Sequence, residues 1–518
     1  MAKKTITLLI LDGWGNGNRD ISNPIFQAKT PHIDFLKENY PFTSLQASGI
    51  AVGLPWNEPG SSEVGHLTIG AGQVIYQHYP RISIVIRNGS FFQNKVLSDA
   101  INFVKKNNST LHIIGLLTSA TVHASYEHLI ALLKFCKNNN LSAVALHLFS
   151  DGRDGKAREA PILLDNLISE MTAIGIGRIA TLIGRFYAMN HEDEWFKTNR
   201  AFNLIVENIG EEISDYKEAF KKLYEDPANT DEYLPPLVLS KEKFKDGDAA
   251  IFFNFREDGI RQLTRAFVDP QFKEFKRPPR NNIFIATFTK IFNDLTIPVA
   301  FPFEPPKITL TKILAFYHMR QLKITEAAKA AHVTYFFNGL SHEVFPLESR
   351  RIFPASEESI FKKPEMRCLE ITDALIAALG DRLYDFIFVN LANPDMAAHT
   401  GDFELGVKTA SIIDEALGRI YDAVLNTGTI LIVTSDHGNL ERMRNPETAE
   451  QETSHNLSPV PFLLVTKEIT KKKSADEVRR REQHMSGTLA DIAPTILELF
   501  GIPKPPEMTG RSLLGEIL

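Results

Sequence analysis

Short, continuously apolar runs recur along the chain, and amphipathic stretches separate them. The strand candidates are residues 5–11, 111–118, 143–150, 179–184, 249–255, 283–288, 386–391, 429–435 and 460–465. Most are apolar at every position rather than at alternate positions, which is typical of strands buried on both faces of a parallel sheet. Helical patterns such as residues 158–171 and 404–425 lie between them. Alternating strands and helices predict an α/β fold of the doubly wound type.

Many of these runs end on a polar or charged residue. The residues at or just beyond the ends are Asp12, Asp151, Arg153, Asp154, Arg185, Arg256, Asp395, Asp436 and His437. Ligands of open α/β sheets bind at the carboxyl ends of the strands. A polar residue there also simply opens a loop, but so many acidic, histidine and arginine endings favour a site.

The two ends of the chain and its middle carry different chemistry at these positions. The ends supply carboxylates and histidines, which are metal-ligand types, whereas the middle supplies arginines, which bind anions. Residues 293–306 are rich in proline and predict a linker, and a second crossing near residues 73–81 would insert a middle domain into an outer one. We therefore expect two doubly wound α/β domains: a discontinuous outer domain at 1–76 and 303–518, and an inserted domain at 77–302.

Composition agrees with a multidomain globular protein. A length of 518 residues corresponds to roughly two to four domains, and the apolar fraction of 43% and charged fraction of 23% are ordinary for a globular chain. The net charge of −6 is not the basic footprint of a nucleic-acid binder. A local basic pocket can still bind an anionic substrate.

The cysteines and the N-terminus bear on the compartment. Cys136 and Cys368 are too few for a disulfide scaffold, and their apolar helical surroundings predict buried thiols that fit a reducing compartment. The apolar run at 5–11 is too short for a signal peptide, and no stretch approaches the ~20 apolar residues of a membrane span. We expect a soluble, cytoplasmic monomer without a membrane or nucleic-acid partner.

Segments near the C-terminal end combine aspartate with histidine. Asp395 and His399 are four apart and share a face if a helix begins there, so they could hold one cation, although a helix-start aspartate and a surface histidine fit as well. Asp436 and His437 follow a strand and could reach one metal or two neighbouring metals, or form a plain strand-to-turn sequence. His455 lies in a loop that enters the next strand.

Together with Asp12, these groups offer three aspartates and three histidines. Mixed oxygen and nitrogen ligands suit Mn²⁺, Mg²⁺ or Zn²⁺ and exclude a soft thiolate site. Two such ions about 4 Å apart can clamp a phosphoryl group and activate a nucleophile.

The nucleophile candidate lies in the sequence PGSSEVGH at residues 59–66. Ser61 and Ser62 predict the start of a helix, where backbone N–H groups attract phosphate oxygens and stabilise an alkoxide. A plainly capped helix explains the same residues. His66 is interpreted as structural.

A second group of residues, mostly from the middle of the chain, could bind an anion. The sequence SDGRD at residues 150–154 places two carboxylates and an arginine in a tight turn. Arg153 suits bidentate recognition of phosphate or carboxylate, and Asp154 could shuttle a proton from a substrate hydroxyl. An Asx turn with a local ion pair is the alternative. The residues that could complete the pocket are His123, Arg185, Arg256 and Lys329.

The ordered set of motifs resembles the cofactor-independent phosphoglycerate mutases, which belong to the alkaline phosphatase superfamily, over essentially the full length. The matching segments are 8–15 (LLILDGWG), 61–72 (SSEVGHLTIGAG), 151–154 (DGRD), 184–189 (GRFYAM), 253–258 (FNFRED), 332–339 (HVTYFFNG), 393–401 (NPDMAAHTG), 435–439 (SDHGN), 459–462 (PVPF) and 489–513. One of them alone is a weak signal, but the set in this order is highly specific.

The resemblance implies a role for each matching residue. The ligands of one manganese would be Asp12, Ser62, Asp436 and His437. The ligands of the other would be Asp395, His399 and His455. Ser62 would be the nucleophile that becomes phosphoserine. Glycerate and phosphate would be held by His123, Arg153, Asp154, Arg185, Arg256 and Lys329.

The resemblance also implies the fold and the reaction. An alkaline-phosphatase-like domain would be interrupted by a transferase domain. The enzyme would interconvert 3-phosphoglycerate and 2-phosphoglycerate with two Mn²⁺ ions, in preference to Mg²⁺ or Zn²⁺, and without a bisphosphoglycerate cofactor. Another metal-dependent phosphotransferase or phosphatase of the superfamily, and a metal-binding protein that has lost catalysis, are the rival hypotheses.

The substrate residues depart from the family pattern, while all the metal-binding positions match. The family has an arginine where this chain has His191, commonly a basic residue where it has Glu194, and an arginine where it has Gly259. The pocket has therefore lost positive charge, which predicts weaker binding of phosphoglycerate. A neighbouring arginine such as Arg261, or a rearranged loop, could supply the missing charge, and Gly259 could be needed for a positive φ.

Overall fold

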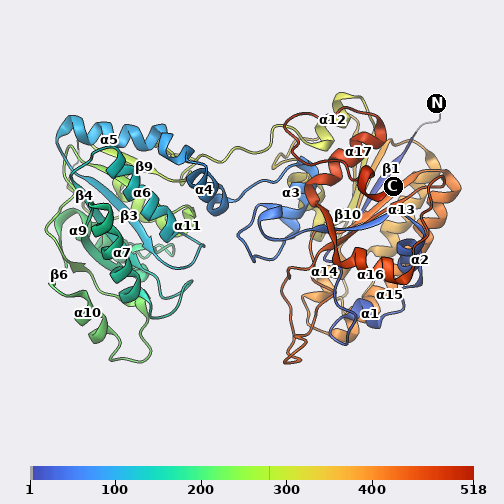
Figure 1. Cartoon of the computed structure of the whole chain (residues 1–518), viewed down its shortest axis with the longest axis horizontal. Helices are drawn as coiled ribbons and strands as arrows, with labels where there is room; N and C mark the ends of the chain where they lie inside the picture. Colours follow the sequence, from blue (N-terminus) through green and yellow to red (C-terminus); the bar gives the residue numbers. More distant parts are fainter. Residues whose placement is uncertain (1–3, 279–280) are drawn as a thin grey trace. The chain divides into compact units, whose positions relative to one another are not determined.

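The computed structural model describes residues 4–278 and 281–518. The chain forms two compact units, an outer unit of Met1–Tyr76 and Pro305–Leu518 and an inner unit of Gln77–Glu304. The inner unit is therefore an insertion in the sequence of the outer one (Figure 1). The chain returns to the outer unit after Glu304, rather than after residue 302.

The outer unit is built on an eight-stranded sheet in the order β11-β10-β12-β1-β13-β14-β2-β15. Its strands are β1 (Ile6–Leu11), β2 (Phe42–Gln46), β10 (Gln321–Glu326), β11 (Glu348–Phe353), β12 (Phe386–Leu391), β13 (Ile430–Thr434), β14 (Val460–Val465) and β15 (Met485–Thr488). The central strand β1 is parallel to β12 and β13. Only β14, within this sheet, runs antiparallel to its neighbours β13 and β2.

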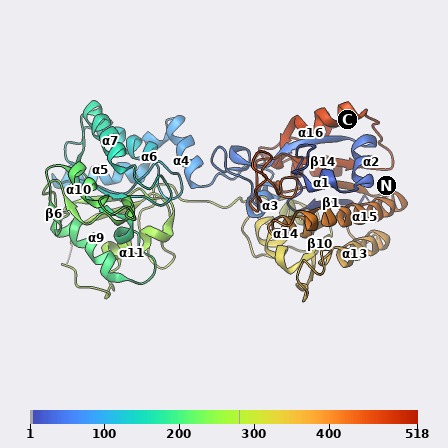
Figure 2. The ribbon, with the colours of Figure 1, turned by 90° about the horizontal axis from the view of Figure 1, so that it is seen from below.

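Helices cover both faces of this sheet (Figures 1 and 2). The helices of the outer unit are α1 (Pro24–Gln27), α2 (Pro31–Asn39), α3 (Ser62–Ala71), α12 (Leu310–Phe316), α13 (Cys368–Asp381), α14 (Asn393–Ala398), α15 (Phe403–Thr427), α16 (Ala475–Gln483), α17 (Ile492–Phe500) and α18 (Leu514–Ile517). Alternate residues of β1 point to opposite faces. Leu9 and Leu11 lie in the core with α13 and α15, whereas Leu8 and Ile10 lie in the core with α3 and α17.

The inner unit has a seven-stranded sheet in the order β6-β7-β5-β4-β3-β8-β9. Its strands are β3 (Leu111–Leu117), β4 (Val144–Ser150), β5 (Arg178–Gly184), β6 (Glu211–Glu212), β7 (Leu237–Val238), β8 (Ala249–Phe252) and β9 (Phe284–Thr287). Its helices are α4 (His78–Arg87), α5 (Lys95–Asn107), α6 (Tyr126–Asn138), α7 (Ala160–Ile174), α8 (Arg185–Ala188), α9 (Trp195–Glu207), α10 (Tyr216–Leu223) and α11 (Glu257–Val268). All pairings are parallel except that of β5 with β7.

The predicted fold class is confirmed, since both sheets are mostly parallel and every apolar run forms a strand. Four strands of the outer sheet, β2, β10, β11 and β15, were not predicted. In β10, Lys323 is buried and forms an ion pair with the buried Glu348 of β11 (3.5 Å). Because of its polar residues, β10 is not a continuous apolar run, and β11 is a partly exposed edge strand. Neither strand therefore has the apolar pattern of a buried strand.

The expected linker at 293–306 is wrong at Ala300 and Phe301. The backbone of Ala300 donates to Thr287 O (2.8 Å), and that of Phe301 donates to Phe288 O (2.7 Å). Phe301 is buried and stacks on Phe91 with ring centroids 5.5 Å apart. Proline marks a stiff segment here, but backbone hydrogen bonds and apolar burial fix the segment in the core of the inner unit.

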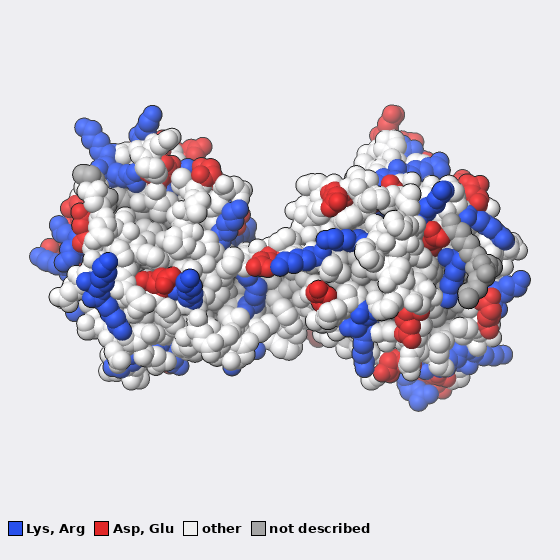
Figure 3. All heavy atoms as spheres, turned by 90° about the horizontal axis from the view of Figure 1, so that it is seen from above, with Lys and Arg blue, Asp and Glu red and all other residues white. Residues whose placement is uncertain are grey.

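Three further observations concern the whole chain. Cys136 and Cys368 are free and buried, as expected, and burial raises the pKa of each thiol to about 12. Within the described residues, the helices are all too short or too polar to cross a lipid bilayer. On the face shown in Figure 3, basic and acidic side chains are interspersed over both units.

Candidate metal and phosphoryl-transfer site

Two clusters of aspartate and histidine lie at the carboxyl ends of the central strands of the outer unit. One consists of Asp12, Asp436 and His437, and the other of Asp395, His399 and His455. In each cluster, the candidate ligand atoms lie within 4.8 Å of one another. The structure thus brings together six of the residues that the sequence assigned to metal binding.

Strand register assembles the first cluster, from Asp12 and the Asp436-His437 pair. The parallel strands β1 and β13 place Ile10 opposite Thr434, so the two aspartates, each two residues further on, leave the sheet at the same edge. All three side chains of the cluster are fully buried. Helix α3 approaches this edge closely, because a Cβ on Gly65 would lie 2.5 Å from the carbonyl oxygen of Asp436.

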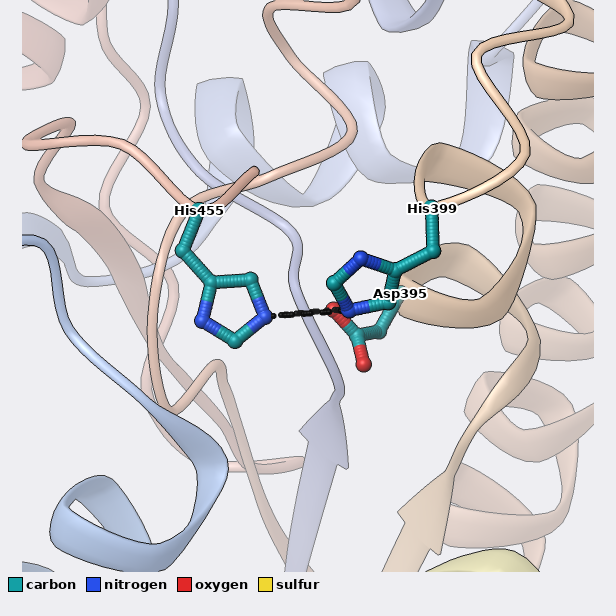
Figure 4. Close-up of side chains that lie close together, drawn as sticks. All are labelled: Asp395, His399 and His455. Atoms are coloured by element: carbon teal, nitrogen blue, oxygen red, sulfur yellow. Dashed lines mark hydrogen bonds and ion pairs between the residues drawn. The ribbon is translucent and has the colours of Figure 1, made fainter. Parts of the chain in front are cut away.

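A short helix and a loop assemble the second cluster. Asp395 lies in the first turn of α14 and His399 directly follows it, so the spacing of four places both on one face. Asp395 Oδ1 lies 3.4 Å from His399 Nε2 and 3.3 Å from His455 Nε2. Figure 4 shows the three side chains converging.

Hydrogen bonds fix the orientation of both imidazoles. His399 Nδ1 lies 2.8 Å from Thr453 O, and His455 Nδ1 lies 2.8 Å from Gly60 O. A carbonyl oxygen only accepts, so each Nδ1 carries the proton and each Nε2 presents a lone pair. The two Nε2 atoms face each other at 3.2 Å, so both lone pairs can be directed at one cation. The donor set therefore fits a metal ion.

Ser62 lies against the first cluster. It is the first residue of α3, after the N-cap Ser61. Its hydroxyl donates to Asp12 Oδ1 (3.2 Å) and lies 2.9 Å from His437 Nε2. The serine is buried, so its oxygen is held where the carboxylate and the imidazole meet.

Lys329 links the two clusters. It ends the 3₁₀ turn Ala327–Lys329 that follows β10, and its Nζ donates to Asp12 Oδ1 (2.6 Å), Asp395 Oδ2 (2.8 Å) and Ser62 Oγ (2.7 Å). Burial alone would lower the pKa of this ammonium, but the surrounding carboxylates raise it above its ordinary value. Lys329 thus lies in the outer unit, among the candidate ligands.

The electrostatic field at the clusters is strongly negative. Burial alone would lower the pKa of His437, but the carboxylates of Asp436, Asp395 and Asp12 raise it to about 10. Burial would likewise raise the pKa of Asp395, yet its contacts with His399 and His455 and the nearby charges of His437 and Lys329 hold it well below its usual range. Asp436 Oδ2 is buried, and His66 Nδ1 lies 3.1 Å from it. These groups favour cations at this edge of the sheet.

Three further residues that the sequence did not single out support the clusters. Asn390 in β12 donates from Nδ2 to Asp12 Oδ2 (2.7 Å). Asn439 donates to Asp395 Oδ1 (2.8 Å), and Glu441 accepts from the backbone of Asn439 (2.9 Å) and from the Gly15 backbone in the β1 loop. Of these three residues, only Asn390 had a signal in the sequence, because it is an asparagine inside an otherwise apolar strand.

His66 belongs to the same network. Its Nε2 lies 3.1 Å from Asn390 Nδ2, which only donates, so its Nδ1 carries the proton. That Nδ1 lies 2.8 Å from Ser62 O and 3.1 Å from Asp436 Oδ2. His66 therefore orients two residues of the first cluster, which is the structural role that the sequence indicated.

The remaining predicted residues line a cavity of about 520 Å³ in the inner unit. The structure brings together here His123, Arg153, Asp154, Arg185 and Arg256. The sixth predicted member of this set, Lys329, lies in the outer unit instead.

A tight turn presents Arg153 and Asp154 to this cavity. The carboxylate of Asp151 accepts from the backbones of both, at 3.2 and 3.1 Å. Gly152 takes a φ of +71°, and a Cβ there would lie 2.6 Å from the backbone nitrogen of Glu232. Arg185 Nη1 donates to Asp151 Oδ1 (2.6 Å) and to Asp154, so the arginine also stabilises the turn.

The structure bears on two explanations suggested for the loss of arginine from the pocket: that Gly259 needs a positive φ, and that Arg261 supplies the missing charge. Gly259 lies in α11 without a positive φ, so its backbone does not require glycine. A Cβ there would instead lie 2.7 Å from Met189 Cε. Arg261 pairs with Glu257 (3.6 Å) and does not line the cavity, so it is not a source of the missing charge.

Comparisons with known proteins agree with this arrangement. The chain matches the family model of the Metalloenzyme superfamily over residues 4–504. It is 40% identical to the 2,3-bisphosphoglycerate-independent phosphoglycerate mutase of Clostridioides difficile over 100% of both chains. It is 41% identical to the protein of the same name from Moorella thermoacetica, over 99% of this chain and 98% of that one.

A solved structure is similar as well. The Leishmania mexicana phosphoglycerate mutase, crystallised at low cobalt concentration, is 28% identical with a TM-score of 0.56, over 99% of this chain and 98% of that one. The fold and the site define a metalloenzyme of this superfamily. Within that class, the chain belongs to the 2,3-bisphosphoglycerate-independent phosphoglycerate mutase family, as its motifs indicated.

Proposed function

We propose that this protein is a phosphoglycerate mutase that interconverts 3-phosphoglycerate and 2-phosphoglycerate in glycolysis and gluconeogenesis, without a bisphosphoglycerate cofactor. The observation that carries the proposal is the position of Ser62 Oγ, which lies within 3.2 Å of Asp12 Oδ1, His437 Nε2 and Lys329 Nζ. Ser62 would accept the phosphoryl group and return it to the other hydroxyl of glycerate.

The proposed metals are two Mn²⁺ ions. Asp12, Ser62, Asp436 and His437 would hold one, and Asp395, His399 and His455 the other; these sets combine carboxylate and imidazole ligands. When bound, the ions supply positive charge that neutralises phosphoryl oxygens and lowers the cost of a serine alkoxide. The facing Nε2 atoms of the two histidines and the buried carboxylate of Asp436 support this assignment.

The chain's own groups prepare the nucleophile. The hydroxyl proton of Ser62 points to Asp12 Oδ1, which can receive it as the serine oxygen attacks phosphorus. Lys329 donates to the same oxygen and stabilises its developing charge. As the bond from Ser62 to phosphorus forms, the bond from phosphorus to the substrate oxygen breaks, and that oxygen takes a proton to give glycerate.

The inner unit would hold the glycerate as a transferase domain, and the outer unit would act as the phosphatase-like domain. Arg153, Arg185 and Arg256 would bind the anionic groups, and Asp154 would give and take the hydroxyl proton. His123 lies 3.7 Å from Asp154, where it would position that carboxylate. Lys329, beside Ser62, would contact the phosphoryl group. We further propose a cytoplasmic monomer, for which the two free thiols support a reducing compartment.

A second candidate is another phosphotransferase or phosphatase of the superfamily that acts on a different small acidic phosphoester. One observation favours it: His191 and Gly259 line the cavity where the family has arginines. A coupled assay with Mn²⁺ and 3-phosphoglycerate, run beside a phosphate-release assay, separates the two. Mutase turnover with little phosphate release supports the first candidate, and phosphate release without 2-phosphoglycerate supports the second.

A further inference from the structure

The cations that line the inner cavity are each paired with a carboxylate. Arg153 lies 3.9 Å from Glu232, and Arg256 lies 2.9 Å from Asp258. The remaining cations, Arg185 and Lys197, pair with Asp154 and Glu194. An anionic substrate must therefore displace a carboxylate to reach any of these positive charges. We expect it to bind where the carboxylate is displaced most easily.

Of these four cations, Lys197 is the one to which the family motifs give no role. It lies in the first turn of α9, is buried, and lines the cavity. Its Nζ lies 3.7 Å above the ring of Phe186, another lining residue. Burial against an aromatic face strips the ammonium of water, so a charged contact to it is stronger than one to an exposed lysine.

The partner of Lys197 is less firmly held. Glu194 accepts from Lys197 and from Asn190 Nδ2 (3.3 Å), but its side chain is 38% exposed and it does not line the cavity. Its carboxylate can return to water at small cost. Among the described residues, Glu194 is the only acceptor of Lys197 Nζ, and an ammonium has three donors.

The other cations are less suited to replace the missing arginines. Arg185 is committed to the Asp151 turn. Arg153 and Arg256 have side chains 61% and 53% exposed, so water screens their charge.

We propose that Lys197 is a substrate-binding residue that supplies the positive charge lost at positions 191 and 259, exchanging Glu194 for an anionic group of phosphoglycerate. This inference rests on the proposed mutase function. As a compact point charge, an ammonium does not need the planar fork of an arginine, and it enters the cavity from α9 rather than from the positions of His191 and Gly259.

The test measures KM and kcat for 3-phosphoglycerate, with Mn²⁺, in three variants. Lys197→Met keeps the length of the side chain and removes the charge, so KM should rise about 10- to 100-fold, as for the loss of a charge-assisted hydrogen bond. Lys197→Arg should restore KM to within a few-fold of wild type. Glu194→Gln frees the ammonium and should lower KM about two- to fivefold.

The chain offers a matched control pair outside the cavity. Lys241 and Glu212 form an exposed ion pair in the same unit (2.9 Å), and neither lines the cavity. Lys241→Met and Glu212→Gln make the same changes of charge and should leave KM unaltered. Circular dichroism and thermal melting check that every variant is folded.

Two results would overturn the inference: a folded Lys197→Met enzyme with the wild-type KM, or a rise in KM in Glu194→Gln, which would make the pair purely structural. If Lys197→Met does not fold, the Glu194→Gln variant alone tests the inference, and a KM in that variant equal to that of wild type would reject it. Failure of the proposed function is a separate outcome, since wild type would then neither turn over nor bind 3-phosphoglycerate.

Discussion

Replacing Asn390 by alanine tests whether a residue that touches no substrate sets the geometry of the first metal cluster. The Asn390 amide is fully buried, and its two N–H groups go to Asp12 Oδ2 (2.7 Å) and His66 Nε2 (3.1 Å). His66 in turn contacts Asp436 Oδ2 (3.1 Å). One amide therefore ties together two carboxylates that come from different strands.

The magnitude follows from the two acceptors that lose a donor. Each buried acceptor left without a hydrogen bond costs about 1–3 kcal/mol, so Asn390→Ala should destabilise the outer unit by about 2–6 kcal/mol in the absence of metal. Asp12 would also be free to turn away from Ser62. Outer-shell changes of this kind lower metal affinity about 10- to 100-fold.

The assay is Mn²⁺ binding by calorimetry, together with thermal unfolding in the presence and absence of metal. Asn338→Ala is the matched control, because Asn338 is a buried asparagine of the same unit that hydrogen-bonds Lys323 (2.5 Å) and Glu343 O (3.2 Å). The control should lose stability and keep its Mn²⁺ affinity. A folded Asn390→Ala protein that binds Mn²⁺ as tightly as wild type would refute the reasoning.

The other predictions follow from single residues. Ser62→Ala should abolish mutase activity while the protein stays folded, and phosphate should be trapped on Ser62 of wild type; more than a few per cent of residual activity would exclude this nucleophile. His455→Ala should lose bound metal and activity together, measured by metal analysis of the purified protein, and full turnover after exhaustive chelation would contradict the two-metal proposal. Burial lowers the pKa of His128 from 6.5 to about 3, so below pH 6.5 the unfolded chain takes up a proton at His128 that the folded inner unit does not. The free energy of unfolding should therefore be full above pH 6.5 and about 2 kcal/mol lower at pH 5 in denaturant titrations. His128→Phe should reduce this pH dependence. His191→Arg should lower KM for 3-phosphoglycerate, whereas Gly259→Arg must first displace Met189; a folded His191→Arg enzyme with an unchanged KM would show that the charge is already supplied elsewhere.

The strands that carry the site were predictable because they are almost wholly apolar. β1, β12 and β13 lie in the middle of a sheet with helices on both faces, so every position is buried, and the only polar residues in them are Thr7, Asn390 and Thr434. The first polar residue after such a strand must lie at the edge of the sheet. Asp12 and Asp436 could therefore both be expected at the carboxyl ends of their strands, whereas their pairing as ligands of one metal came from the resemblance to the family.

The edge of the same sheet was not predictable for the opposite reason. In β10, Gln321, Lys323 and Glu326 are all buried, and Lys323 is tolerated because Glu348 lies 3.5 Å away on β11 and Asn338 accepts from it. Burial still lowers the pKa of this lysine to about 7. A local pattern cannot report such a residue as buried, since its partner lies on another strand.

Lys329 shows how far residue type alone can assign a role. By its positive charge a lysine fits an anion pocket beside arginines, and Lys329 was therefore expected to complete one pocket with His123 and Arg153. In the structure its ammonium lies within 2.8 Å of two carboxylates and of Ser62 Oγ. An ammonium neutralises carboxylates and phosphoryl oxygens by the same charge, so residue type could not decide between the two environments. Only the end of β10, the strand that the apolar pattern did not reveal, places Lys329 beside the nucleophile.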